Sequence, residues 1–360
     1  MLKKAFAILS GLTLACAVAG GQSGPPASRP ILSGPLAKLD IKDAQVEMAR
    51  GTPKGALRIG LHFGIDPGWF DPLGYHGAAL QFFYLMHDAL IKPMPQGEFT
   101  YSLAERAEMS ADYRRAAFRL RPGLKFHDGH PLTTADVKWT YENYRGLGFK
   151  YLQEKVENIQ IVDDRTIVLH FKSPFVDFLD LYSGSGSGIG WIVPRHYYEQ
   201  VGKDGFKARP MGAGPFKFVS QEVGVQMSVE AWDQYWRRAP GVKTINVRAV
   251  RDLAARMAGL ETGELDVAYG MTGKLLQRVM ADPKLRWDPN YTSPWHLVFP
   301  GYNEPTSPFH DQRVRQAVSL AINRPFIVKQ ETQGIGKPWG NWISHGTRDA
   351  LRGDGTELAV

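Results

Sequence analysis

A segment rich in serine and glycine is the first candidate for chemistry in this sequence. Residues 184–188 resemble the turn that carries the nucleophile of α/β-hydrolases, but that turn needs serine at its third position, where this chain has Gly186. The segment also lacks the G-x-G-x-x-G order of a dinucleotide-binding loop. A secreted serine hydrolase using Ser185 is the alternative function. It would need a base beside the serine, and the sequence points to none.

The second candidate is the pair of imidazoles in His127-Asp128-Gly129-His130. Two histidines this close could hold a metal ion, but they lie in a turn just before a helix start, and we expect a solvated turn without metal. The sequence contains no Walker loop and no H-E-x-x-H motif, and its ten histidines are scattered. The residues therefore predict neither a catalytic centre nor a cofactor.

The composition is that of a soluble globular protein. The chain has 360 residues, 43% of them hydrophobic and 22% charged, which is enough for two or three domains or one two-lobed body. A single cysteine, Cys16, excludes an internal disulfide framework. The net charge of +7 comes from scattered basic residues without a long run, so nucleic-acid binding is not expected.

The first 19 residues have the pattern of a secretory signal peptide. Lys3 and Lys4 precede an apolar run of about 15 residues, which is short of the roughly 20 that a membrane-spanning helix needs. The small residues of Ala17-Val18-Ala19 predict cleavage before Gly20 and export to the periplasm. Lipid attachment at Cys16 is the alternative, although Thr13 stands where a lipobox prefers leucine. Residues 20–54 are expected to be a linker and N-terminal segment, rich in Gly and Pro at its start.

The remaining elements follow from hydrophobic periodicity. Alternating apolar residues predict a strand at 57–63, and a helical stripe predicts a helix at 79–90. Pro122-Gly123 predicts a tight turn between short strands at 118–120 and 124–126, and Thr133 predicts a helix cap. We also expect hairpins of 159–161 with 167–171 and of 216–218 with 225–229, helices at 253–262, 275–280 and 311–322, and strands at 266–270 and 295–299. The pattern is mixed α/β with partly antiparallel sheets and no regular βαβ order.

Four segments carry a resemblance to a known family. The longest runs from Leu103-Ala104-Glu105 through Phe118-Arg-Leu-Arg-Pro-Gly-Leu-Lys-Phe-His-Asp-Gly to Val137. The others are Asp71-Pro72, Gly212-Ala-Gly-Pro-Phe216, and Phe309 to Val318 followed by Ala321-Ile-Asn-Arg324. In this order, between about residues 55 and 343, the chain resembles the family 5 extracellular solute-binding proteins, which include the oligopeptide- and dipeptide-binding components of bacterial ABC importers.

The resemblance implies a two-lobed periplasmic binding protein-like fold of type II, similar to cluster C, with the second lobe incomplete. We expect a first lobe with its subdomain at 55–295, the start of the second lobe at 296–343, and a polar tail outside the family pattern at 344–360. The apolar face of helix 311–322 should then lack a cover. Because closure needs both lobes, ligand binding by the 360-residue form should be weak or absent.

The function that the resemblance implies is ligand capture for import. We expect a non-enzymatic, monomeric periplasmic protein that binds peptides or related small solutes and delivers them to the ABC permease and ATPase subunits. It should need no cofactor and bind no nucleic acid. A peptide-loaded chaperone or sensor with the same fold is a further alternative.

Ligand contacts should lie outside the family segments, whose residues suit scaffold roles. A peptide site needs exposed backbone amides and aromatic walls, which indicates the loop after the first strand, the Ser/Gly loop and two weaker positions. The candidates are Trp69, Phe70, Tyr182, Ser183, Gly184, Ser185, Gly186, Trp191, Tyr269 and Asn303.

Overall fold

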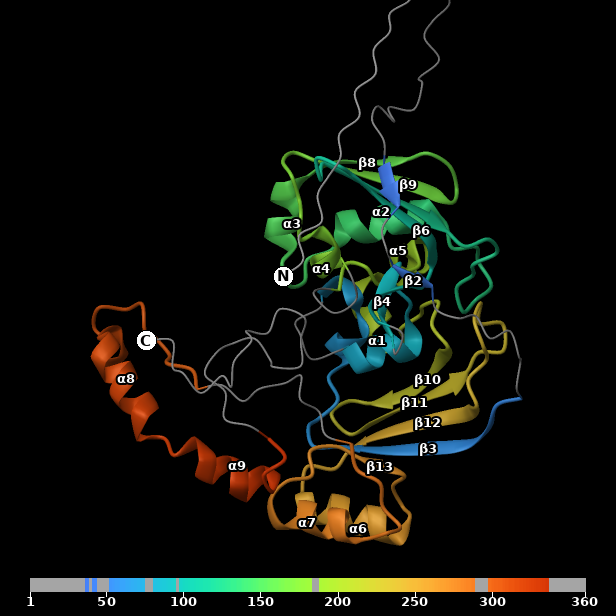
Figure 1. Cartoon of the computed structure of the whole chain (residues 1–360). Helices are drawn as coiled ribbons and strands as arrows, with labels where there is room; N and C mark the ends of the chain where they lie inside the picture. The colour runs from blue at the N-terminus through green and yellow to red at the C-terminus, as the bar shows by residue number, and fades with distance from the viewer. Residues whose placement is uncertain are drawn as a thin grey trace, which may run out of the picture. The chain divides into compact units, whose positions relative to one another are not determined.

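The computed structural model describes residues 36–38, 41–43, 52–74, 80–94, 97–182, 188–288 and 297–336 (Figure 1). The predicted signal peptide, Cys16, most of the linker and the tail at 344–360 lie outside the described residues. The chain from Leu36 onward forms one compact unit, and the elements below belong to it.

The first sheet is antiparallel throughout, in the order β1-β6-β7-β9-β8. Its strands are β1 (Leu36–Lys38), β6 (Ala104–Ser110), β7 (Arg115–Leu120), β8 (Val156–Ile161) and β9 (Thr166–Phe171). The predicted hairpin is confirmed as β8–β9, and Ile159 pairs with Leu169 as alternating apolar residues require. Asp163 Oδ1 accepts the backbone N–H groups of Arg165 and Thr166, both at 2.8 Å, which closes the turn.

The second sheet combines antiparallel and parallel strands in the order β10-β11-β12-β3-β13. Its strands are β3 (Lys54–Leu61), β10 (Phe216–Glu222), β11 (Gln226–Ala231), β12 (Val242–Ala249) and β13 (Val267–Ala268). The predicted β10–β11 hairpin is confirmed, whereas β12, β3 and β13 run parallel. Helix α6 (Leu253–Thr262) connects β12 to β13, and these three elements form a βαβ unit that the sequence pattern did not indicate.

Strand β3 has neighbours on both faces of the second sheet. Leu61 lies in the core cluster with Phe216 and Val229, while a Cβ added to Gly60 would lie 2.7 Å from Leu265. Leu265 follows α6, which begins at its predicted start and ends at Gly263 with φ +73°. A small three-stranded sheet, β2-β5-β4, completes the strands: β2 (Lys42–Asp43), β4 (Ile91–Met94) and β5 (Gly97–Tyr101).

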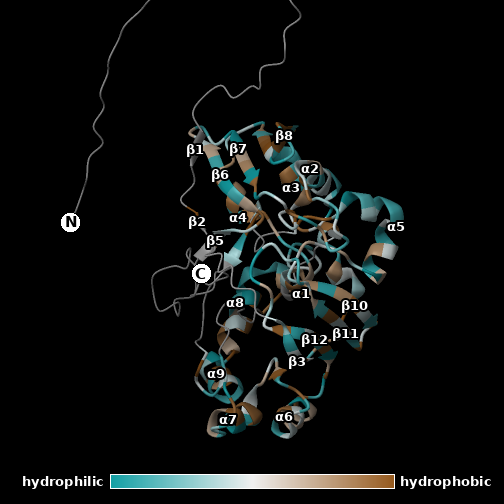
Figure 2. Ribbon diagram, turned by 90° about the vertical axis from the view of Figure 1, so that its right-hand side faces the viewer, coloured by the Kyte–Doolittle hydropathy of each residue, from teal (hydrophilic) through white to brown (hydrophobic). Residues whose placement is uncertain are grey.

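The helices connect and cover these sheets. They are α1 (Leu80–Met86), α2 (Thr134–Asn143), α3 (Phe149–Lys155), α4 (Phe178–Tyr182), α5 (Arg195–Ala208), α6, α7 (Gly273–Ala281), α8 (Gln312–Ala321) and α9 (Arg324–Thr332), with 3₁₀ turns η1 (Pro67–Phe70), η2 (Pro72–Gly74) and η3 (Pro308–His310). Helix α1 joins the two large cores, because Phe83 belongs to the cluster of the first sheet and Phe82 and Met86 to that of the second. Figure 2 shows hydrophobic and hydrophilic segments alternating along α6 and α7.

Two predicted strands are wrong. Residues 124–126 do not pair with 118–120, because β7 pairs with β6 and β9 and Lys125 forms only an isolated bridge to Pro131. Residues 297–299 are irregular, and the start of that predicted strand lies outside the described residues. The first helix stops at Met86 instead of continuing to Leu90, since the backbone of Gly214 donates to the Met86 carbonyl at 3.0 Å.

Helices α8 and α9 carry exposed apolar side chains. Leu320 is 69% exposed and Phe326 is 59% exposed, and neither helix has a buried residue. Val314 and Val318 of α8 are half-buried, so Leu320 is the large apolar residue of this helix that is exposed among the described residues.

Candidate functional site

Three parallel strands of the second sheet end at one edge. The registers pair Leu61 of β3 with Ala249 of β12, and Gly60 of β3 with Ala268 of β13. In α/β proteins, ligands bind where loops leave the carboxyl ends of parallel strands. The carboxyl edge is defined here by His62, Trp69, Arg256, Tyr269 and Gly270.

Arg256 ties together the loops that follow β12 and β13. Its Nη1 donates to the carbonyl oxygens of Val250 at 2.6 Å and Arg251 at 2.9 Å, and its Nη2 donates to that of Gly270 at 3.1 Å. The residue is 3% exposed, and its buried Nε has no hydrogen-bond partner among the described residues. Burial lowers the pKa of the guanidinium, which Asp252 partly opposes, but arginine stays charged at neutral pH. The carboxyl edge thus contains a buried positive charge with an unused donor.

His62 contacts the loop after β13. A Cβ added to Gly270 would lie only 3.0 Å from His62 Nδ1. Gly270 also has φ +67°, a conformation that favours glycine, so both the space and the backbone require glycine there. Burial lowers the pKa of His62, and the charge of Arg256 lowers it further. His62 is therefore neutral at neutral pH, when it can donate with one ring nitrogen and accept with the other.

Trp69 connects this edge to the core. Asp66 Oδ1 accepts the Gly68 N–H at 2.7 Å and thereby starts the turn η1 that places Trp69. The indole meets Phe63 edge-on, with ring centroids 5.4 Å apart, and Phe63 meets His62 edge-on at 4.6 Å. Contacts therefore run from Trp69 through Phe63 and His62 to Gly270, beside the 49% exposed Tyr269. Two predicted candidates, Trp69 and Tyr269, are brought to the same edge.

Three other candidates are packed inside the core. Phe70 is 0% exposed, Tyr182 is 1% exposed and Trp191 is 0% exposed. Trp191 packs against Phe83 and lies over the ammonium group of Lys92, 5.6 Å from its ring centroid. These side chains have almost no surface to offer a ligand in this structure.

The remaining candidates are separate from the carboxyl edge or outside the description. Asn303 is exposed in a turn after Gly301. The Ser/Gly loop of Ser183, Gly184, Ser185 and Gly186 lies outside the described residues. Its role in ligand binding and the serine hydrolase alternative both stay predictions.

The family segments lie against one another in the interior. His127 Nδ1 accepts the Gly212 N–H at 3.3 Å, and its Nε2 lies 3.0 Å from the Gly214 carbonyl oxygen. A Cβ on either glycine would fall within 2.5 Å of the Met86 backbone. The fully buried Asp71 accepts the Tyr198 hydroxyl at 2.9 Å, and burial raises its pKa. These contacts agree with the scaffold roles expected for the segments.

No local pattern in the sequence marks His62 or Arg256 as functional. His62 directly follows β3, and Arg256 lies in the first turn of the helix after β12. Such positions indicate a ligand site only when the strands are known to be parallel and adjacent. The sequence pattern did not reveal the pairing of β12, β3 and β13, and so it gave no reason to place these residues together.

The fold and these segments agree with a known family. The model of the bacterial extracellular solute-binding proteins, family 5, matches residues 98–352, which is more than half of the chain. The chain belongs to this family. The resemblance drawn from the four segments is confirmed.

Relatives and solved structures support the assignment. The chain is 29% identical over 243 residues to the glutathione-binding protein GsiB of Pectobacterium atrosepticum, covering 66% of this chain and 46% of that protein. It is 27% identical over 277 residues to the dipeptide-binding protein of Escherichia coli, covering 67% and 49%. The binding protein MoaA of A. tumefaciens R10, solved with mannopinic acid, has a TM-score of 0.66 at 27% identity, covering 78% of this chain and 58% of that one.

The family sets limits on what the chain does. It is a family of solute-binding proteins, and the chain spans about half the length of the curated relatives it matches. Across the described ranges, no helix is both long enough and apolar enough to cross a membrane.

Proposed function

We propose that the protein captures a peptide or a related small solute and delivers it to an ABC importer. The observation that carries this proposal is the family match over residues 98–352. The relatives named above are described as binding glutathione and dipeptides, and the solved MoaA holds mannopinic acid. These ligands share a small size, polar backbones and at least one carboxylate. A carboxylate-bearing solute is therefore the proposed ligand class.

The carboxyl edge supplies complementary groups for such a ligand. Arg256 is 3% exposed, so it would attract an anionic group through the field of its buried charge and not by direct contact. Trp69 and Tyr269 contribute partly exposed aromatic surface. Asn303 is proposed as a contact from the second lobe, which we place at 296–343 after a first lobe at 55–295. Ser183, Gly184, Ser185 and Gly186 are proposed as backbone and hydroxyl donors, with Tyr182 and Trp191 supporting them from the core of the first sheet. Phe70 is proposed to support Trp69 from the core of the second sheet.

The proposed route to the periplasm uses the N-terminal segment. Residues 1–19 would direct export and be removed before Gly20, and acylated Cys16 is the alternative mature N-terminus. The mature protein would act as a monomer with the permease and ATPase subunits of its importer. Mass spectrometry of the N-terminus decides between the two forms.

Ligand-observed saturation-transfer NMR tests the ligand site, because it detects weak as well as tight binding. Glutathione and mixed di- to pentapeptides should receive saturation from the protein. Tyr269→Ala should reduce this transfer, since Tyr269 is exposed at the carboxyl edge, while Tyr151→Ala on α3, which is 37% exposed, should leave it unchanged. Absence of transfer from every solute would contradict ligand capture. Equal transfer in both variants would contradict this site. Stoichiometric labelling of Ser183, Ser185 or Ser187 by a fluorophosphonate would favour a hydrolase instead.

A further inference from the structure

Two histidines and an aspartate from distant parts of the chain meet at the surface near α5. Asp128 and His130 lie in the turn that precedes α2, and His196 lies in the first turn of α5. Their potential ligand atoms all lie within 4.8 Å of one another. His127, the neighbouring histidine in the sequence, points inward to Gly212 and Gly214, so its ring is not part of this group.

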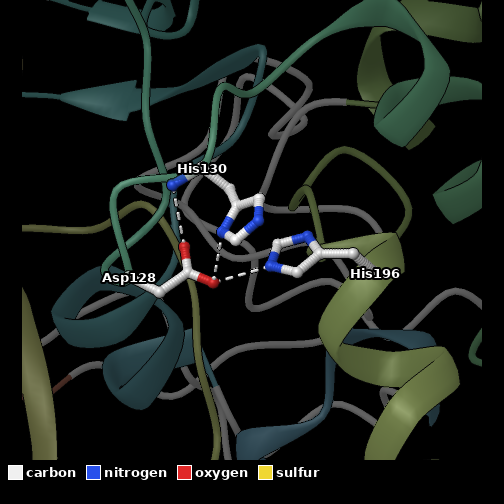
Figure 3. Close-up of side chains that lie close together, drawn as sticks. All are labelled: Asp128, His130 and His196. Atoms are coloured by element: carbon white, nitrogen blue, oxygen red, sulfur yellow. Dashed lines mark hydrogen bonds and ion pairs between the residues drawn. The ribbon is translucent and has the colours of Figure 1, made fainter.

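The Asp128 carboxylate lies beside the two imidazole rings, and one of its oxygens contacts both of them (Figure 3). Asp128 Oδ2 is 2.6 Å from His196 Nε2 and 3.0 Å from His130 Nδ1. The two imidazole rings are nearly parallel, with centroids 4.1 Å apart and planes inclined by 26°. His196 Nε2 and His130 Nδ1 therefore face the same carboxylate oxygen.

Local contacts fix the group before any ion arrives. Asp128 Oδ1 accepts the His130 backbone N–H at 3.0 Å, which orients the carboxylate. Gly129, at φ +91°, donates its backbone N–H to Phe126 at 2.9 Å and closes the turn. His127 holds the start of the same turn to Gly214.

We propose that Asp128, His130 and His196 bind a late first-row divalent transition metal ion such as Zn²⁺. Imidazole nitrogen and carboxylate oxygen are ligands that zinc, nickel, copper and iron accept, and two histidines with one carboxylate form a recurrent three-ligand set with open positions for water. Zinc needs bonds of about 2.0–2.2 Å to these atoms. The ion would replace the two hydrogen bonds to Oδ2, and only side-chain rotations would be needed to bring three atoms already within 4.8 Å of one another onto it.

The ligand side chains are accessible to an ion from solvent. The side chain of His130 is 60% exposed, that of His196 34% and that of Asp128 24%. The bound ion would connect the turn before α2 to α5, two segments that are 66 residues or more apart in sequence. It would therefore stabilise the folded chain by preferential binding to the native state.

Isothermal titration of the chain without a polyhistidine tag, using Zn²⁺ alone, tests the proposal. We expect one site that His130→Ala weakens by at least about tenfold. His130 is the most exposed ligand, so this variant should keep the parent circular dichroism spectrum. His310→Ala, which removes an exposed histidine outside the group, is the matched control and should bind as the parent does.

Thermal unfolding gives an independent readout. Excess Zn²⁺ should raise the melting temperature of the parent and of His310→Ala, and EDTA should reverse this increase. Mg²⁺ at the same concentration should not raise the melting temperature. If His130→Ala and His196→Ala bind Zn²⁺ as tightly as the parent, the three residues form only an ion pair with stacked rings and the proposal is wrong. Absence of Zn²⁺ binding by the parent would overturn it equally.

Discussion

The imidazole of His127 lies 3.0 Å from the carbonyl oxygen of Gly214, a residue 87 positions later in the chain. The other ring nitrogen accepts the Gly212 N–H at 3.3 Å, so the proton of the neutral ring is on Nε2. Two segments of the family signature are joined through one side chain. The ring can fulfil both roles only while it is neutral, because a protonated Nδ1 could not accept.

This relationship predicts how stability depends on pH. Burial lowers the pKa of His127 to about 4, below the 6.5 of the unfolded chain, and the unfolded state therefore binds more protons between these values. Stability should be unaffected by this residue above pH 6.5 and should fall as the pH drops toward 4. Urea unfolding between pH 7 and 4.5 should show a weaker pH dependence in His127→Gln than in the parent. The exposed His310→Gln should follow the parent, and identical curves for all three would contradict the assignment.

The backbone of Met86 and His87 lies so close to Gly214 that even a methyl group there should lower the free energy of unfolding strongly. A Cβ there would lie 2.5 Å from the Met86 carbonyl carbon and 2.6 Å from the His87 nitrogen, and neither backbone can move without disturbing the end of α1. Gly214→Ala should lower the free energy of unfolding by about 2–4 kcal/mol. Gly241→Ala, whose Cβ meets nothing within 4 Å, should change it by less than about 0.5 kcal/mol in the same urea titration.

Local signals in the sequence predicted local structure well. The Thr133 cap, the Gly263 helix end and the β8–β9 hairpin each depend on residues close together in the chain, and all three are confirmed. The parallel pairing of β3 with β12 was not predicted, because its partners are nearly 190 residues apart and no short pattern encodes that contact. A turn at Pro122-Gly123 was also mistaken for a hairpin, since buried Leu124 and Phe126 resemble strand residues.

The same limit applied to the candidate sites. The sequence predicts both Trp69 and Trp191 at the ligand site because each follows a loop. Trp69 is partly exposed at the carboxyl edge, whereas Trp191 is fully buried and packs against the ammonium group of Lys92. Burial depends on tertiary packing, which sequence spacing does not specify. His196 was not considered beside Asp128 for the same reason, since 68 residues separate them.

The capping box of α2 allows a matched comparison of two threonines. Thr133 accepts the Ala135 N–H and its own backbone N–H donates to Asp136 Oδ2 at 3.0 Å, whereas Thr272 stands at the start of α7 without a side-chain cap bond. Thr133→Ala should lower the free energy of unfolding by about 1 kcal/mol. Thr272→Ala should have little effect. Equal losses in thermal or urea unfolding would show that the cap bond contributes nothing.

The carboxylate of Asp88 is fully buried and forms an ion pair with Lys92. It lies 2.7 Å from Lys92 Nζ and accepts the Tyr235 hydroxyl and the Trp236 indole N–H, both at 2.8 Å. Burial by itself would raise its pKa, but Lys92 and the hydrogen-bond donors bring it below the ordinary 3.8. Asp88 therefore stabilises the fold above pH 3.8, and this contribution is lost as the pH falls below that value.

Removing one member of the buried Asp88–Lys92 pair should lower the free energy of unfolding more than breaking an exposed ion pair does. Asp88→Asn leaves the Lys92 ammonium buried without its partner and should lower the free energy of unfolding by about 3–5 kcal/mol at pH 7. The double variant Asp88→Asn/Lys92→Met should recover much of that loss. Glu199→Gln, which breaks an exposed 2.9 Å pair with Arg195 on α5, should cost less than about 0.5 kcal/mol. If Asp88→Asn proved no more destabilising than Glu199→Gln, the Asp88 carboxylate would not be held in the charged, paired state that the structure shows.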